Sequence, residues 1–224
     1  MPLPHDLRPS RVLSLAMDHL LANVMDRVDT LSGSMAEWYD LVNQGVREPA
    51  KALASSQQEE NIGEWFEYLW SATRGIRKDL TQQMLKDPLA VALMEKCARL
   101  HIVCSERLVE ESSHNFDRKL NDENLTKCLQ TLKHMYEDLR VEGTRSPNEP
   151  EFMAYDVLMN LNDGDTLRTI QNMEPWVRSH PSIKFALKVF MALNSNNYIK
   201  FFRLVRQEAS LLQGCILLRY FYQV

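Results

Sequence analysis

Four residues have types and spacings that could bind a metal ion. Cys97, His101 and Cys104 are four and three residues apart, so on a helix they share one face. Cys128, on a later segment, could complete a tetrahedral zinc site. The two cysteines of the first segment also belong to an apolar stripe, and a lone buried histidine is more often a hydrogen-bonded core residue than a ligand. We therefore expect no metal site here.

Catalytic motifs are missing from the sequence. G-x-S-x-G, H-E-x-x-H, the P-loop and G-x-G-x-x-G do not occur, and the seven glycines are scattered singly. The acidic pairs Glu59-Glu60 and Glu110-Glu111 fall in loops or at helix ends, where solvated charge is the ordinary explanation. We expect no catalytic residue, no cofactor and no enzyme activity.

A short cationic cluster is the remaining candidate site. Arg74, Arg77 and Lys78 follow Trp65 and Trp70 within one segment. Cations beside aromatic rings could contact a phosphate backbone or an acidic partner. A charged face turned to solvent explains such a cluster more often. These three residues are the predicted contacts for nucleic acid or an acidic partner.

The segment that must position this cluster, residues 64–83, is predicted to be an amphipathic helix. Its apolar side chains recur at helical spacing and include two tryptophans, each of which buries a large area when packed. We expect this helix to be the spine of the fold. The predicted structural core includes five residues from this helix and later ones: Trp65, Trp70, Leu129, Leu132 and Phe202.

The remaining segments also predict helices. One begins at Ser10, a second follows the capping pair Asp87-Pro88, and a third covers residues 122–140, with Asn121 or Asp122 as its cap and Gly143 at its end. Shorter helices are predicted at 152–159, 165–173, 182–193, 196–207 and 210–222. No segment alternates with period two over any length, and the connections are short. The fold class is therefore predicted to be all-α, an antiparallel stack of helical hairpins, or α-solenoid.

Composition narrows the class of protein. The 224 residues are 45% hydrophobic and carry a formal net charge of −4. This charge argues against a chain built as a whole to coat nucleic acid and is compatible with a local basic patch. The N-terminus lacks the apolar stretch of a signal peptide, and the longest apolar run is too short to span a bilayer. These features predict a soluble intracellular protein without a membrane anchor.

An aromatic element occurs twice. The stretch from Glu37 to Val42 resembles the stretch from Glu64 to Leu69 position by position, and the residues between them are rich in Ser, Gln, Glu and Ala. We divide the chain into an N-terminal helix at 1–34, a partly mobile insert with the duplicated element at 35–63, and a helical repeat region at 64–224.

Several stretches together carry a resemblance to a known family. These are Trp70–Gln83 (WSATRGIRKDLTQQ), Glu95–Ile102, Phe116-Asp117, Glu151–Tyr155 and Asn194–Val205 (NSNNYIKFFRLV). In this order and spacing they resemble the SAC/GANP family, from about Leu7 to the C-terminus. The resemblance implies a helical region of the PCI type (proteasome lid, signalosome, initiation factor), which a winged-helix subdomain normally completes. No such segment follows Val224, which suggests a fragment.

The resemblance also implies a function. Members of the family are scaffold subunits of the nuclear transcription-and-export complex, which couples transcription to mRNA export through the nuclear pore. The implied partners are a second PCI-type subunit, a small acidic subunit and pore components, with mRNA bound weakly or indirectly by this region. The implied location is the nucleus, including the nuclear pore and envelope. The alternative is a PCI-type helical scaffold of a proteasome lid, signalosome or translation-initiation complex.

Overall fold

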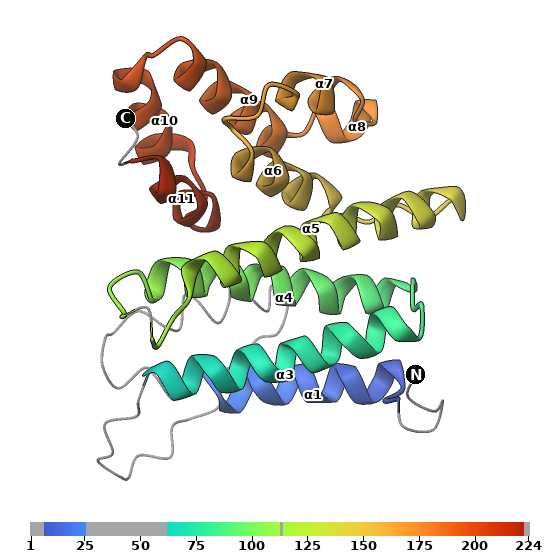
Figure 1. Ribbon diagram of the computed structural model, residues 1–224. Coiled ribbons are helices and arrows are strands. Elements are labelled where there is room, and N and C mark those ends of the chain that lie inside the picture. The colour runs from blue at the N-terminus through green and yellow to red at the C-terminus, as the bar shows by residue number, and fades with distance from the viewer. Residues whose placement is uncertain (1–6, 26–61, 113, 222–224) are drawn as a thin grey trace. The chain divides into compact units, whose positions relative to one another are not determined.

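The computed structural model describes residues 7–25, 62–112 and 114–221, and within these ranges every regular element is a helix (Figure 1). From residue 62 onward the connections between helices are short, as in a stack of hairpins. The predicted fold class, an all-α helical stack, is confirmed for this part of the chain. The expected insert, residues 35–63, lies outside the described residues except for Ile62 and Gly63, and so does the aromatic copy at Glu37–Val42.

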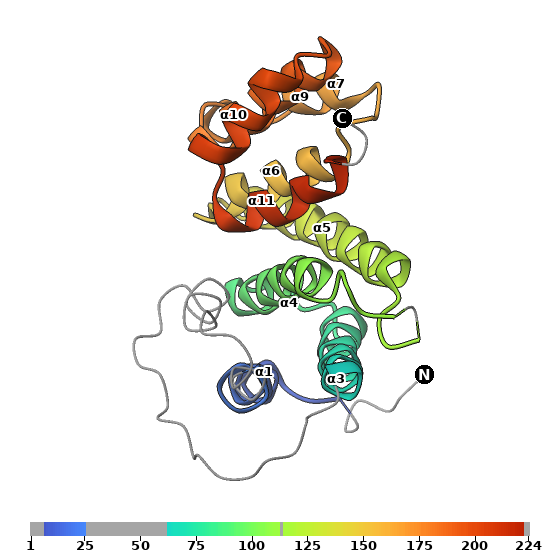
Figure 2. The same cartoon turned by 90° about the vertical axis from the view of Figure 1, so that its left-hand side faces the viewer.

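The chain divides into two compact units, Met1–Asn121 and Asp122–Val224, and the division falls within helix α5 (Arg118–Val141). The first unit contains α1 (Ser10–Asn23), α3 (Ile62–Gln82) and α4 (Pro88–Arg107). These three helices pack against one another pairwise. Figure 2 looks nearly along the axes of α1 and α3. Their shared core contains Leu13, Met17, Leu21, Leu69, Ile76, Leu80, Leu93 and Cys97.

Helix α4 begins as its sequence predicts. The Asp87 carboxylate accepts a hydrogen bond from the backbone N–H of Ala90 at 3.1 Å, and Pro88 occupies the first turn, where its missing N–H costs nothing. Nearly the whole middle of α4 is buried, including the charged residues Glu95 and Arg99. A helix that is buried on most of its surface lies inside its unit, whereas an amphipathic surface helix is buried on one side only.

Helix α5 begins one turn earlier than predicted. The cap is Asp117, whose carboxylate accepts the N–H of Leu120 at 3.0 Å, so the predicted capping by Asn121 or Asp122 is wrong. Asp and Asn both cap well, so local propensity does not choose among these three positions. The predicted end is confirmed, because Gly143 has a φ of 79° and the N–H of Thr144 bonds the Leu139 carbonyl oxygen at 2.8 Å.

The second unit is built from short helices after α5. They are α6 (Glu149–Met159), α7 (Thr166–Gln171), α8 (Pro175–Arg178), α9 (Pro181–Asn194), α10 (Tyr198–Glu208), α11 (Leu211–Leu217) and the 3₁₀-helix η3 (Leu218–Tyr220). Helix α9 packs against both α6 and α10, and α11 packs against α6 (Figure 1). The sequence predicted these elements except α8, a single turn that begins at Pro175, and it predicted α11 and η3 as one helix.

Polar contacts hold the ends of this unit together. The Tyr220 hydroxyl donates to the Met159 carbonyl oxygen at 2.9 Å and accepts the Leu161 N–H at 3.3 Å, so η3 is attached where α6 ends. Arg140 in the last turn of α5 pairs with the buried Glu149 in the first turn of α6. The cation lies at a helix C-terminus and the anion at a helix N-terminus, so each also complements a helix dipole.

Among the described residues, no helix combines the length and the apolar character needed to cross a lipid bilayer.

Candidate interaction surface

Helix α3 carries the predicted cationic cluster, and Trp65 anchors its first turns. The Trp65 side chain is 7% exposed, and its indole N–H donates to the Val24 carbonyl oxygen at 2.9 Å. This bond joins the start of α3 to the residues that follow α1. Tryptophan supplies both the apolar area and the single donor that such a junction needs.

Trp70 lies differently from Trp65. It is half-buried rather than buried, and the guanidinium of Arg74 lies over its ring, 5.2 Å from the centroid. One turn of helix separates the two residues, so the cation–π contact follows from their i, i+4 spacing. Arg74 is thereby held against the helix with its charge at the surface.

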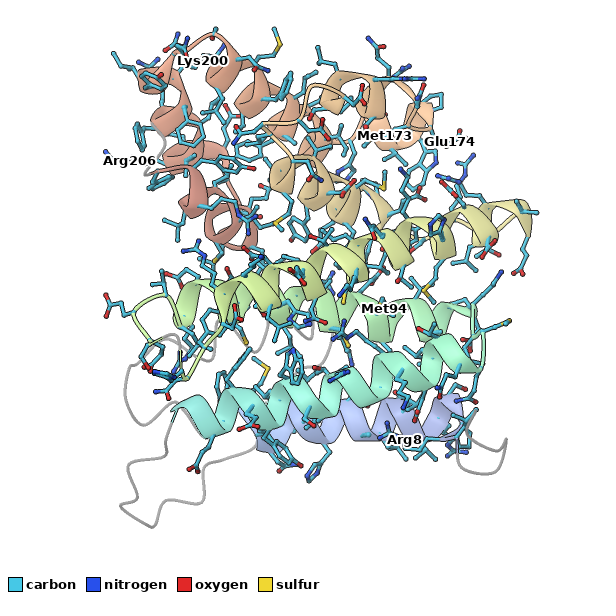
Figure 3. All side chains as sticks on the ribbon, viewed as in Figure 1. Arg8, Met94, Met173, Glu174, Lys200 and Arg206 are labelled. Atoms are coloured by element: carbon cyan, nitrogen blue, oxygen red, sulfur yellow. The ribbon has the colours of Figure 1, made fainter. Side chains whose placement is uncertain are left out.

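The three cations of the cluster lie on one side of α3 but are not equally exposed. Arg77 is half-buried, and its charge is felt by the buried His101, whereas Lys78 is exposed. The next residue, Asp79, pairs with Arg8 at 2.6 Å, and Figure 3 labels Arg8 beside α1. Helix α3 contains three acidic and three basic residues, so its net charge is zero. The predicted contact role of Arg74, Arg77 and Lys78 stays a prediction.

A buried polar pair occupies the centre of the first unit. His101 Nδ1 and the Asn121 side-chain oxygen are 2.8 Å apart, and the Asn121 amide donates to the His101 carbonyl oxygen at 2.9 Å. Burial lowers the pKa of His101 from 6.5 to about 4; the Asn121 hydrogen bond opposes this shift and the Arg77 charge adds to it. The imidazole is therefore neutral at physiological pH, with its proton on Nδ1 facing Asn121.

The cysteines near His101 are arranged as core residues. Cys97 and Cys104 are buried, and burial raises the pKa of the Cys104 thiol to about 12. The Cys104 thiol is therefore protonated, and both cysteines pack as small apolar side chains. In the part of the chain that the structure describes, no group of three or more His, Cys, Asp or Glu side chains is placed to hold a metal ion.

The other predicted core residues lie in the second unit. Leu129 is 4% exposed and Leu132 is fully buried, whereas Phe202 is half-buried. Phe202 stands edge-on to Phe201 and to Phe221, with ring centroids 5.3 Å apart in both pairs. Only the tertiary structure brings Phe221 to these rings.

A second cationic surface was missed at the sequence level. It lies on the α9–α10 hairpin, where Lys184, Lys200, Arg203 and Arg206 are exposed and Lys188 pairs with Glu208 at 2.6 Å. These residues are spread over 23 positions, so no short run of charge marks them. A count of charge per hairpin, rather than a search for runs, would have found them.

These features define a class of protein. The described residues are stacked helical hairpins with a buried, hydrogen-bonded interior and charged residues on their outer faces. Stacks of helical hairpins offer extended surfaces on which other molecules can bind. The sequence profile of the SAC3/GANP family matches residues 50–224. The chain belongs to this family, which confirms the resemblance found in the sequence.

Three relatives extend the comparison. The chain is 40% identical over 221 residues to "Protein xmas" of Drosophila melanogaster, covering 98% of this chain and 9% of that protein. It is 33% identical over 191 residues to SAC3 family protein B of Arabidopsis thaliana, covering 80% and 11% of the two chains. It is 28% identical over 241 residues to SAC3 family protein 1 of Schizosaccharomyces pombe, covering 99% and 20%. The chain thus spans a fifth or less of each of these relatives.

Proposed function

We propose that this chain is a non-enzymatic scaffold region of a nuclear transcription-and-export complex that couples transcription to mRNA export through the nuclear pore. The observation that carries the proposal is membership of the SAC3/GANP family across most of the chain. The scaffold works by presenting rigid helical surfaces to other subunits and performs no chemistry of its own.

The buried interior supports a scaffold role. His101 and the Cys104 thiol, two groups of types that enzymes use for chemistry, are buried and in their neutral forms. Reactive side chains in enzymes are instead exposed to a substrate pocket. The exposed side chains that remain are charged or apolar contacts of the kind that protein interfaces use.

The proposed partners are a second PCI-type subunit, a small acidic subunit and components of the nuclear pore, and the proposed location is the nucleus, including the pore and envelope. In this arrangement the chain contacts mRNA weakly or through its partners. A helical-hairpin stack suits such an assembly, because its successive hairpins offer a long surface for several proteins at once.

Affinity capture from nuclear extract tests the proposal. The chain of 224 residues is immobilised, the extract is treated with ribonuclease, and captured proteins are identified by mass spectrometry. We expect a PCI-type protein and a small acidic protein of the export complex. Leu132→Asp, which places a charge in the core, is the unfolded control and should capture neither. Recovery of proteasome-lid, signalosome or initiation-factor subunits without the export proteins would overturn the proposal.

A further inference from the structure

Positive charge is concentrated in the α9–α10 hairpin. Residues 181–208 contain five basic residues, Lys184, Lys188, Lys200, Arg203 and Arg206, and one acidic residue, Glu208, which leaves a net charge of +4. The whole chain carries −4, so the residues outside this hairpin carry −8. Such separation of charge creates a local positive potential on a chain that is acidic overall.

The cations of α10 lie on one face of the helix. At about 100° per residue, positions 199, 200, 203, 206 and 207 occupy an arc of about 120°, and all five side chains are exposed. The opposite arc holds Phe201 and Leu204, which are buried. Figure 3 shows the labelled side chains of Lys200 and Arg206 extending from the outer side of α10.

The three cations of this face have no counter-ion in the part of the chain that the structure describes. Among the described residues, no ion pair involves the side chain of Lys200, Arg203 or Arg206. The one carboxylate of the hairpin, Glu208, is occupied by Lys188. The cations of α3 differ, since as many acidic as basic residues lie on that helix. The α10 face is therefore available to an external anion.

The start of α10 carries an aromatic side chain that can contact a nucleobase. Tyr198 is 40% exposed, and its hydroxyl donates to the Asn196 side-chain oxygen at 3.2 Å, which holds the ring at the tip of the hairpin. An exposed aromatic ring can stack on a base. The guanidinium of an arginine can donate two parallel hydrogen bonds to two oxygens of one phosphate. An acidic peptide helix would instead need a seam of apolar side chains, and on this arc Ile199 is the only one.

We propose that the outer face of α10, formed by Lys200, Arg203 and Arg206 with Tyr198 at its end, is a binding site for single-stranded RNA. The cations contact the phosphate backbone without regard to sequence, and the tyrosine stacks on one base. This site rests on the proposed function, in which the chain contacts mRNA weakly or through its partners, and it assigns the direct contact to α10. RNA binding by the chain and capture of the export proteins are measured separately, so either can fail without the other.

Fluorescence anisotropy with a labelled 20-nucleotide poly(U) strand tests the site. The full chain is titrated at 50 to 250 mM KCl, and the logarithm of the association constant is plotted against the logarithm of salt concentration. Three phosphate contacts to a single strand predict a slope of about −2. The triple variant Lys200→Gln/Arg203→Gln/Arg206→Gln should lose most of the affinity and bring the slope close to zero. Tyr198→Ala should weaken binding roughly five-fold with the slope unchanged.

A matched control separates a site from net charge. Lys119, Lys127 and Lys133 are exposed on α5, and replacing all three with Gln changes the net charge by the same amount. This control should keep at least half of the affinity and the same slope. Equal loss in both triple variants, or loss in Arg74→Gln/Lys78→Gln with none in the α10 variant, would overturn the assignment. Competition by polyglutamate as effective as that by unlabelled poly(U) would also overturn it, in favour of an acidic polypeptide.

Discussion

His101 is a buried base whose charge state depends on its surroundings. The imidazole is 4% exposed, Nδ1 bonds Asn121, and no hydrogen-bond partner of Nε2 is present among the described residues. Protonating Nε2 would place a charge in the core near the Arg77 guanidinium. The cost of that charge makes the stability of the first unit sensitive to acid.

We expect the free energy of unfolding to fall as the pH falls from 6.5 to about 4, because over this range the unfolded histidine binds a proton and the folded one does not. The stabilisation is complete above pH 6.5 and is lost near pH 4, a difference of roughly 3 kcal/mol. Urea unfolding at pH 7 and 4.5 measures it. His101→Gln, which cannot titrate, should lose roughly 2 kcal/mol less between these pH values. Equal losses in both proteins would show that His101 titrates normally.

Met84 occupies a backbone conformation that suits glycine. Its φ is 51° after the end of α3, where the Leu85 N–H bonds the Leu80 carbonyl oxygen, and its side chain is 78% exposed. A side chain at such a position costs about 1 kcal/mol. Met84→Gly should relieve this strain, although glycine also increases the conformational entropy of the unfolded chain and so offsets part of the gain. The net rise in the free energy of unfolding should be about 0.5–1 kcal/mol. Met84→Ala keeps the Cβ atom and should change stability by less than about 0.5 kcal/mol, as thermal melts would show.

At the level of the helix, α5 carries a buried apolar stripe along most of its length. Leu125, Cys128, Leu129, Leu132, Met135, Tyr136 and Leu139 are all 5% exposed or less. These positions recur every three or four residues, so one side of the helix is buried over most of its length.

Leu132→Ala should lower the free energy of unfolding by about 2–5 kcal/mol, since it removes buried methyl groups and leaves a cavity. Val141→Ala, at the exposed end of the same helix, is the matched control and should change stability by less than about 0.5 kcal/mol. Chemical denaturation of the two variants measures both values. A Leu132→Ala protein as stable as the control would place this position on the surface.

For the whole molecule, the short distance between the end of α1 and the start of α3 determines how much of the connecting chain can be deleted. The bond from the Trp65 indole to the Val24 carbonyl oxygen, 2.9 Å long, shows that the end of one helix lies beside the start of the other. A connection of nine residues spans up to about 30 Å, far more than this junction needs. Residues 26–34 are therefore long enough to join the two helices directly.

Deleting residues 35–61 should thus leave the described helices folded, with a thermal midpoint within a few degrees of the full chain. Trp65→Ala should destabilise the protein by about 3–5 kcal/mol, because it removes a buried ring and its hydrogen bond. Circular dichroism melts of both variants measure the effects. If the deletion unfolds the protein while Trp65→Ala is tolerated, the copy at Trp38 holds the core position and the subdivision at 35–63 is wrong.

Much of this molecule follows from local sequence. The stripe of α5, the Asp87-Pro88 start of α4 and the Gly143 end of α5 involve residues within about five positions of one another. Helical hydrogen bonds and caps act over this same range, so local sequence suffices to place them. The family motifs are likewise read directly from the chain, and they identify its class.

Contacts between distant residues required the tertiary structure. Asn121 meets His101 rather than capping α5, and Arg8 reaches Asp79 across 71 positions. The exposed cationic face of α10 and the half-burial of Arg77 on α3 likewise appear only in the tertiary structure. Whether a side chain is buried or exposed depends on which helices pack beside it. The packing of the helices is set by the apolar area buried over the whole unit, and a local sequence pattern does not contain that information.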